Sequence, residues 1–259
     1  MHLKALLLDI DGTLMFKGQA IAGANETLRN ARERGLLVRL LTNISARSAD
    51  QIAGELQAAG IDAMADQIQT AASACAHHVK AHAGASCHLL VPPAMESLFE
   101  GVPRNCEAPD FVVVADVAER FDYANLNLAF RLVRQGATLL VPHRNLYWHD
   151  REGPMLDAGA FIVGLEAATG RSASITGKPS PLFFQAALAA LGVEAHEAIV
   201  VGDDMRTDIA GAQALGLEHV LVLTGKGRDH GDTGQAPARH RIASIADLLD
   251  HLTATALIP

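Results

Sequence analysis

The stretch "LLLDIDGTLM", residues 6–15, decides how the rest of the chain is interpreted. Its first part, Leu6–Leu8, contains no polar residue, which is typical of a strand buried on both faces. Asp9 and Asp11 follow at once. Two carboxylates this close repel each other where water is excluded, so they need a counter-charge. Because side chains alternate along a strand, both are expected to face the same way. The stretch therefore predicts a buried strand that ends in a binding site.

The composition predicts a soluble globular protein without a nucleic-acid or membrane partner. Of the 259 residues, 49% are hydrophobic and 19% charged, and the formal net charge of −8 disfavours binding to a phosphate backbone. The apolar run near the start is too short for a signal peptide, and no stretch approaches the ~20 apolar residues that span a bilayer. Three cysteines (Cys75, Cys87 and Cys106) without CxxC spacing suit a reducing compartment, so we expect a cytoplasmic protein.

Short apolar runs alternate with amphipathic segments along most of the chain, which predicts an α/β fold with a doubly wound parallel sheet. Some of the amphipathic segments stop at a glycine, such as Gly35 or Gly60, which commonly ends a helix. The predicted strands are 4–8, 36–43, 87–92, 110–117, 137–143, 198–204 and 219–227. The predicted helices are 24–34, 45–59, 66–83, 121–136, 157–170, 181–191, 207–215 and 244–256.

Four strands are expected to end in polar residues that packing alone does not explain. In an open parallel sheet, ligands bind outside the carboxyl ends of the strands, so these groups are expected to converge on one site. Carboxylates crowded in this way, with oxygen as the ligand atom, predict bound Mg²⁺. Gly12 allows a tight turn and is expected to offer its N–H to an oxyanion. The four groups are Asp9/Asp11, Thr42/Asn43, Thr176–Lys178 and Gly202–Asp204.

These residues resemble the motifs of a known family. "DIDGT" (9–13), "LLTN" (40–43), "GKP" (177–179) and "VGDDMRTD" (201–208) occur in the same order as the four motifs of the haloacid dehalogenase-like phosphohydrolases. The long insert between the second and third motifs resembles the α/β cap of the type IIA members, which include nitrophenylphosphatase-like, pyridoxal-phosphatase-like and phospholysine/phosphohistidine pyrophosphatase-like enzymes. Segments 109–143 and 183–192 are most similar to the last branch.

The resemblance implies a division of the chain into two domains. A discontinuous catalytic core is expected from residues 1–72 and 173–259, and an α/β cap from residues 73–172. The cap is expected to close over the site, to choose the substrate and to form a homodimer. The substrate implied is a small phosphorylated metabolite: a phosphomonoester, pyrophosphate or a phospho-amino acid.

The resemblance also implies a role for each acidic residue. Asp9 is expected to attack phosphorus and form an aspartyl-phosphate. Asp11 is expected to protonate the leaving oxygen and then deprotonate the hydrolytic water. Mg²⁺ is expected to bind the Asp9 carboxylate, the Asp11 backbone carbonyl and Asp203. Asp208 is expected to steer Lys178 or a water molecule, and Asp204 to support the site.

The phosphoryl group itself is expected to contact four residues. Thr42 would donate its hydroxyl, Asn43 and Gly12 a backbone N–H each, and Lys178 would neutralise the charge that develops in the transition state. Phosphoryl transfer depends mainly on positioning and charge balance, which these residue types can supply.

Three other functions are weighed against a phosphatase. A phosphoryl-accepting signalling domain also uses strand-end acids, a Thr and a Lys around Mg²⁺, but Asp11 and a domain-sized insert disfavour it. A non-catalytic scaffold that dimerises through the cap would be indicated by loss of Asp9, Asp11 or Lys178, and all three are present. A dinucleotide-binding enzyme would need GxGxxG after the first strand, which carries DGT instead.

A second set of metal-ligand residue types lies within residues 75–88. Two of its histidines are spaced i, i+4, which suits a zinc site on a helix. Because neither a CxxC pair nor an HExxH motif accompanies them, we interpret these residues as surface or core residues, with zinc as the minor alternative. The set is Cys75, His77, His78, His82, Cys87 and His88.

Overall fold

The computed structural model describes residues 3–149, 154–228 and 237–258. The chain forms two compact units: the first comprises Met1–Thr42, Ala49–Gln69 and Lys178–Pro259, and the second Asn43–Ser48 and Thr70–Gly177. These divisions fall a few residues from the domain boundaries expected from the sequence, and the short segment 43–48 goes with the second unit. In the described part of the chain, no helix is long and apolar enough to cross a membrane.

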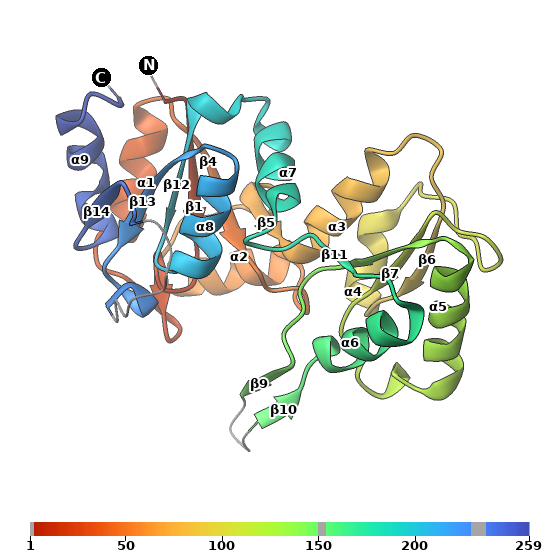
Figure 1. Ribbon diagram of the computed structural model, residues 1–259. Coiled ribbons are helices and arrows are strands. Elements are labelled where there is room, and N and C mark those ends of the chain that lie inside the picture. The colour runs from red at the N-terminus through yellow and green to blue at the C-terminus, as the bar shows by residue number, and fades with distance from the viewer. Residues whose placement is uncertain (1–2, 150–153, 229–236, 259) are drawn as a thin grey trace. The chain divides into compact units, whose positions relative to one another are not determined.

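The first unit is built around a six-stranded sheet in the order β14-β13-β12-β1-β4-β5 (Figure 1). β1 pairs in parallel with β4 and β12, and β13 in parallel with β12 and β14. Chain order runs outward from β1 on both sides, so the sheet has a switch point between β1 and β12, and open parallel sheets bind ligands at such a point, outside the carboxyl ends of the strands. The strands are β1 Ala5–Asp9, β4 Leu37–Thr42, β5 Ile68–Thr70, β12 Ala198–Gly202, β13 Glu218–Val222 and β14 His240–Ile242.

Helices cover this sheet in two groups. All residues of β1 and β12 are buried, as strands covered on both faces require. α1 packs against α9, and α7 against α8, which places one pair on each face, as right-handed crossovers on the two sides of β1 demand. The helices are α1 Ala24–Glu33, α2 Ala49–Ala58, α7 Pro181–Leu191, α8 Ala210–Ala214 and α9 Leu248–Ala254. A small hairpin, β2 Met15–Phe16 and β3 Gln19–Ala20, follows β1.

The second unit has its own parallel sheet in the order β11-β8-β7-β6. Alternation along β7 fills both faces: Val112 and Val114 pack with α5 and α6, whereas Phe111 and Val113 pack with α3 and α4. The strands are β6 Cys87–Leu90, β7 Phe111–Val114, β8 Thr138–Val141 and β11 Ser174–Ile175, and β9 Tyr147–His149 pairs with β10 Pro154–Leu156. The helices are α3 Ala71–Lys80, α4 Pro93–Glu96, α5 Tyr123–Gln135 and α6 Ala158–Thr169.

Three predicted helices begin at a different residue from the one that the sequence indicated, each for a structural reason. α2 begins at Ala49 rather than 45, because residues 43–48 pack with the second unit. The helix predicted over 66–83 is α3 alone, because the preceding Ile68–Thr70 is an edge strand of the core sheet. The helix predicted over 207–215 begins as a π-helical turn, Met205–Ile209, before α8.

Candidate active site

The carboxyl ends of three buried strands bring the predicted motifs to one edge of the core sheet. Asp9 is the last residue of β1 and pairs with Leu41, so Thr42 at the end of β4 comes next to it. On the other side, β12 ends at Gly202 and Asp203 follows directly. The register of the sheet therefore places Asp9 between the other two motifs, at the switch point.

A buried lysine joins two of the acids. Lys178 Nζ lies 2.5 Å from Asp9 Oδ1 and 2.7 Å from Asp208 Oδ1. The exposed fractions of Lys178, Asp9 and Asp208 are 6%, 5% and 1%, so these ion pairs form almost without water. The Thr13 hydroxyl donates to Asp9 Oδ2 at 3.3 Å. Both oxygens of the expected nucleophile are thus held by hydrogen bonds, which buried charges require.

The electrostatics of the cluster favour an additional positive charge. Burial raises the pKa of Asp9 well above its usual value; Lys178 opposes this rise, and Asp208 and Asp203 add to it. Burial also raises the pKa of Asp203, to about 6, against the backbone hydrogen bond from Lys226. Burial acts to lower the pKa of Lys178, but Asp208 and Asp9 outweigh it and the pKa is raised, so the lysine stays charged.

The residues fit a divalent cation with oxygen ligands. Carboxylate oxygens of Asp9, Asp203 and Asp208 all lie within 4.8 Å of one another, and all three residues are buried. Three carboxylates face one ammonium, that of Lys178, so two formal negative charges remain uncompensated. A hard dication such as Mg²⁺ matches both the donor atoms and this charge.

Asp11 does not share the burial of Asp9. The strand ends at Asp9, and Asp11 lies in the turn that follows, where its side chain is exposed. The Ile10 carbonyl closes this turn by accepting from the backbone N–H groups of Leu14 and Met15, both at 2.9 Å. The direction of Asp11 is therefore set by a turn, and not by the strand alternation that the sequence suggested.

Gly12 has a different hydrogen bond from the one expected. Its N–H donates to the Met15 carbonyl at 2.6 Å, within the turn, instead of being directed to an oxyanion. Gly12 has a φ of +96°, and a Cβ atom there would overlap the Asp203 carboxylate. The structural reason for a glycine is thus the close approach of Asp203.

The two residues of the second motif fall in different units. Thr42 is buried at the end of β4 in the first unit. Asn43 begins the segment 43–48 of the second unit, where a Cβ atom on Gly177 would lie 2.9 Å from Asn43 Oδ1. Binding of a phosphoryl group by Thr42 and Asn43 remains a prediction.

The last motif divides its acids between two tasks. Asp208 lies in the π-helical turn, where Oδ1 accepts from Lys178 and Oδ2 accepts from the Asp204 N–H at 3.2 Å. Asp204 caps this turn by accepting from Arg206 N at 2.8 Å, and its Oδ2 pairs with Lys226 Nζ at 2.6 Å. Asp208 therefore acts directly on the lysine, and Asp204 supports the local backbone.

Sequence reasoning missed two contributors to the site. Thr13 belongs to the quoted "DIDGT" but received no role, although its hydroxyl contacts Asp9. The segment Thr224–Lys226 follows β13 and contacts both Gly12 and Asp203. Its signal was the same as for the other motifs, since polar residues and a glycine follow a buried strand there.

The cysteines and histidines of residues 75–88 form no comparable cluster. Within the described ranges, the grouping of three or more metal-ligand side chains is Asp9, Asp203 and Asp208. Cys75 Sγ lies 2.8 Å from the Thr176 hydroxyl, and Cys87 Sγ accepts from Arg104. These contacts support the interpretation of the set as core and surface residues.

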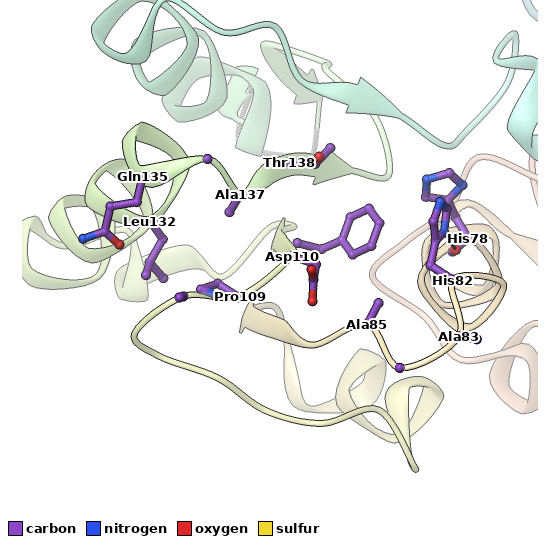
Figure 2. Close-up of a pocket in the computed structure, with 14 residues that line it drawn as sticks. His78, His82, Ala83, Ala85, Pro109, Asp110, Leu132, Gln135, Ala137 and Thr138 are labelled. Atoms are coloured by element: carbon purple, nitrogen blue, oxygen red, sulfur yellow. Dashed lines mark hydrogen bonds between the residues drawn. The ribbon is translucent and has the colours of Figure 1, made fainter.

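Two of these histidines line a cavity of about 760 Å³ at the amino ends of the second unit's strands (Figure 2). His78 and His82 meet the Phe111 ring edge to face, with centroids 5.7 and 5.2 Å away. Burial lowers the pKa of His78, as do the neighbouring His82 and His77. Asp110, also on the lining, is exposed, and its Oδ2 accepts from Ser86 N and Oγ. The cavity thus combines two histidine rings packed against an aromatic ring with a solvated carboxyl group.

Comparison with known proteins agrees with this geometry. A family model described as haloacid dehalogenase-like hydrolase matches residues 6–102, and a related one, HAD-hydrolase-like, matches residues 175–252. The mouse phospholysine phosphohistidine inorganic pyrophosphate phosphatase is 36% identical over 256 residues, which cover 95% of this chain and 94% of that protein.

Solved structures share the whole architecture. NagD from E. coli K-12 superposes with a TM-score of 0.86 and 29% identity, covering 96% of this chain and 99% of that one. The 4-nitrophenylphosphatase from Thermotoga maritima gives a TM-score of 0.81 and 28% identity over 96% and 97%. The fold is a doubly wound core with an inserted α/β cap domain. The chain belongs to the haloacid dehalogenase-like hydrolase family, as an enzyme of the phosphatase type.

Proposed function

We propose that this chain hydrolyses a small phosphorylated metabolite with Mg²⁺, through an aspartyl-phosphate formed on Asp9. The observation that carries the proposal is the buried set of three carboxylates and one lysine at the switch point of the core sheet. Such a set balances charge around an incoming phosphoryl group, which is what phosphoryl transfer requires. Asp9, Asp203 and the backbone carbonyl of Asp11 would hold the cation.

In the first step, an Asp9 carboxylate oxygen forms a bond to phosphorus and the bond from phosphorus to the leaving oxygen breaks. Lys178, in contact with Asp9, favours the ionised form that the attack needs. Asp208 holds the lysine from its other side. Mg²⁺, when bound, would neutralise part of the negative charge of the carboxylates and the phosphoryl oxygens.

Asp11 completes both half-reactions by moving one proton. It donates the proton to the leaving oxygen, and it then takes one from the water whose oxygen attacks phosphorus and releases Asp9. Its side chain is exposed two residues after Asp9, so it is open to a substrate and to water. Thr42 and Lys178 would donate hydrogen bonds to the phosphoryl oxygens as charge develops.

The names of the relatives support the substrate class. One relative is named for phospholysine, phosphohistidine and inorganic pyrophosphate, and another for 4-nitrophenyl phosphate. Each of these compounds presents a terminal phosphoryl group on a small molecule. We infer a substrate of that class, either a phosphomonoester, pyrophosphate or a phospho-amino acid.

The test is release of inorganic phosphate from a panel containing 4-nitrophenyl phosphate, other phosphomonoesters, pyrophosphate and phospholysine. We expect release with Mg²⁺, none with excess chelator, and loss of at least about 10³-fold in Asp9→Asn. Asp250→Asn is the matched control, because this aspartate is exposed on α9.

Two outcomes would contradict the proposal. A fully active Asp9→Asn variant would exclude Asp9 as the nucleophile. A phosphate that stays on Asp9 without release would indicate a phosphoryl-accepting signalling domain instead.

A further inference from the structure

The segment Thr224–Lys226, called the brace below, interlocks with two of the strand-end loops of the site. It follows β13 and leads into the 3₁₀ turn Gly225–Arg228. Nothing in the proposed chemistry uses its side chains. Its contacts nevertheless fall on Asp203 and Gly12, which belong to the loops after β12 and β1.

The first contact fixes one oxygen of Asp203. The backbone N–H of Lys226 donates to Asp203 Oδ2 at 2.6 Å. A backbone donor has no side-chain rotamers to lose, so it orients its acceptor more firmly than a flexible side chain would. With Oδ2 engaged in this way, Oδ1 is the oxygen that can turn to a cation.

The second contact is steric: Gly12 and Gly225 lie on either side of the Asp203 carboxylate and form a narrow slot around it. A Cβ atom built on Gly12 or on Gly225 would overlap Asp203 Oδ2. The Cβ atom on Gly225 would also lie 2.7 Å from Gly12 Cα, and the φ of Gly225 is +47°, which favours glycine. The two glycines therefore form the walls between which the carboxylate lies.

The third contact is a hydrogen bond between the brace and Gly12. The Thr224 hydroxyl donates to the Gly12 carbonyl at 2.5 Å, and Thr224 is only 8% exposed. The turn after β1, which carries Asp11, is thus connected to the loop after β13 by a buried hydrogen bond. A shift of the brace would move Asp203 and this turn together.

We propose that the brace is a positioning element that presents Asp203 to a divalent cation and holds the Asp11–Gly12 turn beside it. The inference rests on the proposed function, since the cation is the one invoked there. Groups that orient metal ligands without binding the metal commonly change metal affinity by about 10–100-fold when they are removed.

The experiment measures cation binding directly, without turnover. Mn²⁺ serves as a paramagnetic probe, and its dissociation constant is obtained by electron paramagnetic resonance on the full chain without substrate. We expect Gly225→Ala to weaken Mn²⁺ binding by at least about 10-fold and Thr224→Val by several-fold, with Thr224→Ser close to wild type because it keeps the hydroxyl. Thermal unfolding in chelator shows whether each variant is folded.

Gly216→Ala is the matched control. Gly216 has a similar left-handed φ of +66°, but a Cβ atom there has no neighbour within 4 Å. The control carries the backbone strain of the substitution without the overlap with Asp203, so it should bind Mn²⁺ as the wild type does. If Gly225→Ala does not fold, the Mn²⁺ dissociation constants of Thr224→Val and Thr224→Ser test the proposal.

The outcomes separate this inference from the proposed function. The proposal for the brace would be overturned if both variants, Gly225→Ala and Thr224→Val, fold and their dissociation constants for Mn²⁺ lie within about twofold of the wild-type value. Absence of Mn²⁺ binding by the wild-type chain would overturn it as well. Weakened binding in the variants, together with no phosphate release by the wild type from any compound, would support the brace and reject the proposed function.

Discussion

The two units differ in the ionisable groups that they bury. The first unit buries charged groups: Asp9, Asp208 and Lys178 form ion pairs almost out of contact with water. The second unit buries the Cys75 thiol, whose pKa is raised by burial to about 12, and the carboxyl group of Asp157, which accepts from the Ala158 N–H at the start of α6. The roomy cavity of Figure 2 lies in this second unit, beside a His78 whose pKa is lowered.

This difference shows that the volume of a cavity is a poor guide to chemistry in this molecule. A buried charge is costly and persists only where partners hold it, so a concentration of such charges indicates selection for a task. The second unit's cavity has a volume of about 760 Å³ but no comparable concentration of charge in its described lining. The predictions below test this contrast.

The largest effect is expected from Lys178→Met. The variant leaves Asp9 and Asp208 buried without their cation, so we expect a loss of kcat/KM of about 10³-fold and a destabilisation of about 3–5 kcal/mol. Phosphate release and urea unfolding measure the two effects. Lys80→Met, at an exposed lysine of the second unit, is the control. A Lys178→Met enzyme whose kcat/KM is within tenfold of the wild-type value would contradict the contrast drawn between the two units.

The thiols test whether burial keeps Cys75 of the second unit neutral. A pKa of about 12 for Cys75, against an ordinary value of 9.0, leaves about 10³-fold less thiolate at pH 8, so its reaction with a disulfide reagent should be slower by at least that factor. Cys106 is exposed and should react at the ordinary rate. Rapid native modification of Cys75 would contradict this account; unfolding in urea should make all three cysteines reactive.

Cation binding should stabilise the first unit. At a Mg²⁺ concentration of 100 times its dissociation constant, we expect about 2.7 kcal/mol of added stability, seen as a higher unfolding temperature that chelator reverses. Asp203→Asn removes a carboxylate of the cluster and should lose most of this increase. An equal increase in that variant would show that the stabilising cation binds elsewhere.

The smallest effect is expected from Lys226→Met. The ammonium of Lys226 pairs with Asp204, but the lysine side chain is 75% exposed, and exposed ion pairs contribute at most about 1 kcal/mol. The backbone N–H that contacts Asp203 is unchanged in this variant. Urea unfolding should therefore show a loss below that value, and a larger one would mean that the side chain has a structural role beyond the pair.

The sequence predicted most of the site because its acids follow buried strands. The run Leu6–Leu8 marked β1, and parallel strands bring their carboxyl ends to one edge, so Asp9 and Asp203 could be grouped from local patterns. The same argument does not hold for Lys178, because the strand before it, β11, belongs to the sheet of the second unit. The fold class could be predicted in the same way, from the alternation of apolar runs and amphipathic segments.

The rest depended on contacts that local patterns do not encode. The edge strand β5 has only three residues and precedes an alanine-rich helix, so the helical pattern concealed it. The polar residues and the glycine after β13 could have marked the brace as a segment. Its contact with Asp203 could not be predicted, because the donor is a backbone N–H, which every residue except proline possesses. The π-helical turn at 205–209 likewise gives Asp208 its position through backbone geometry.

The slot around Asp203 has a consequence for how mutations in this family should be interpreted. Gly12 and Gly225 carry no functional group, yet any side chain at either position would occupy the volume of the Asp203 carboxylate. In a saturation-mutagenesis library, both positions should therefore be as intolerant as the aspartates themselves. A search limited to reactive side chains would overlook these two glycines, because each contributes only the absence of a side chain, which leaves room for the Asp203 carboxylate.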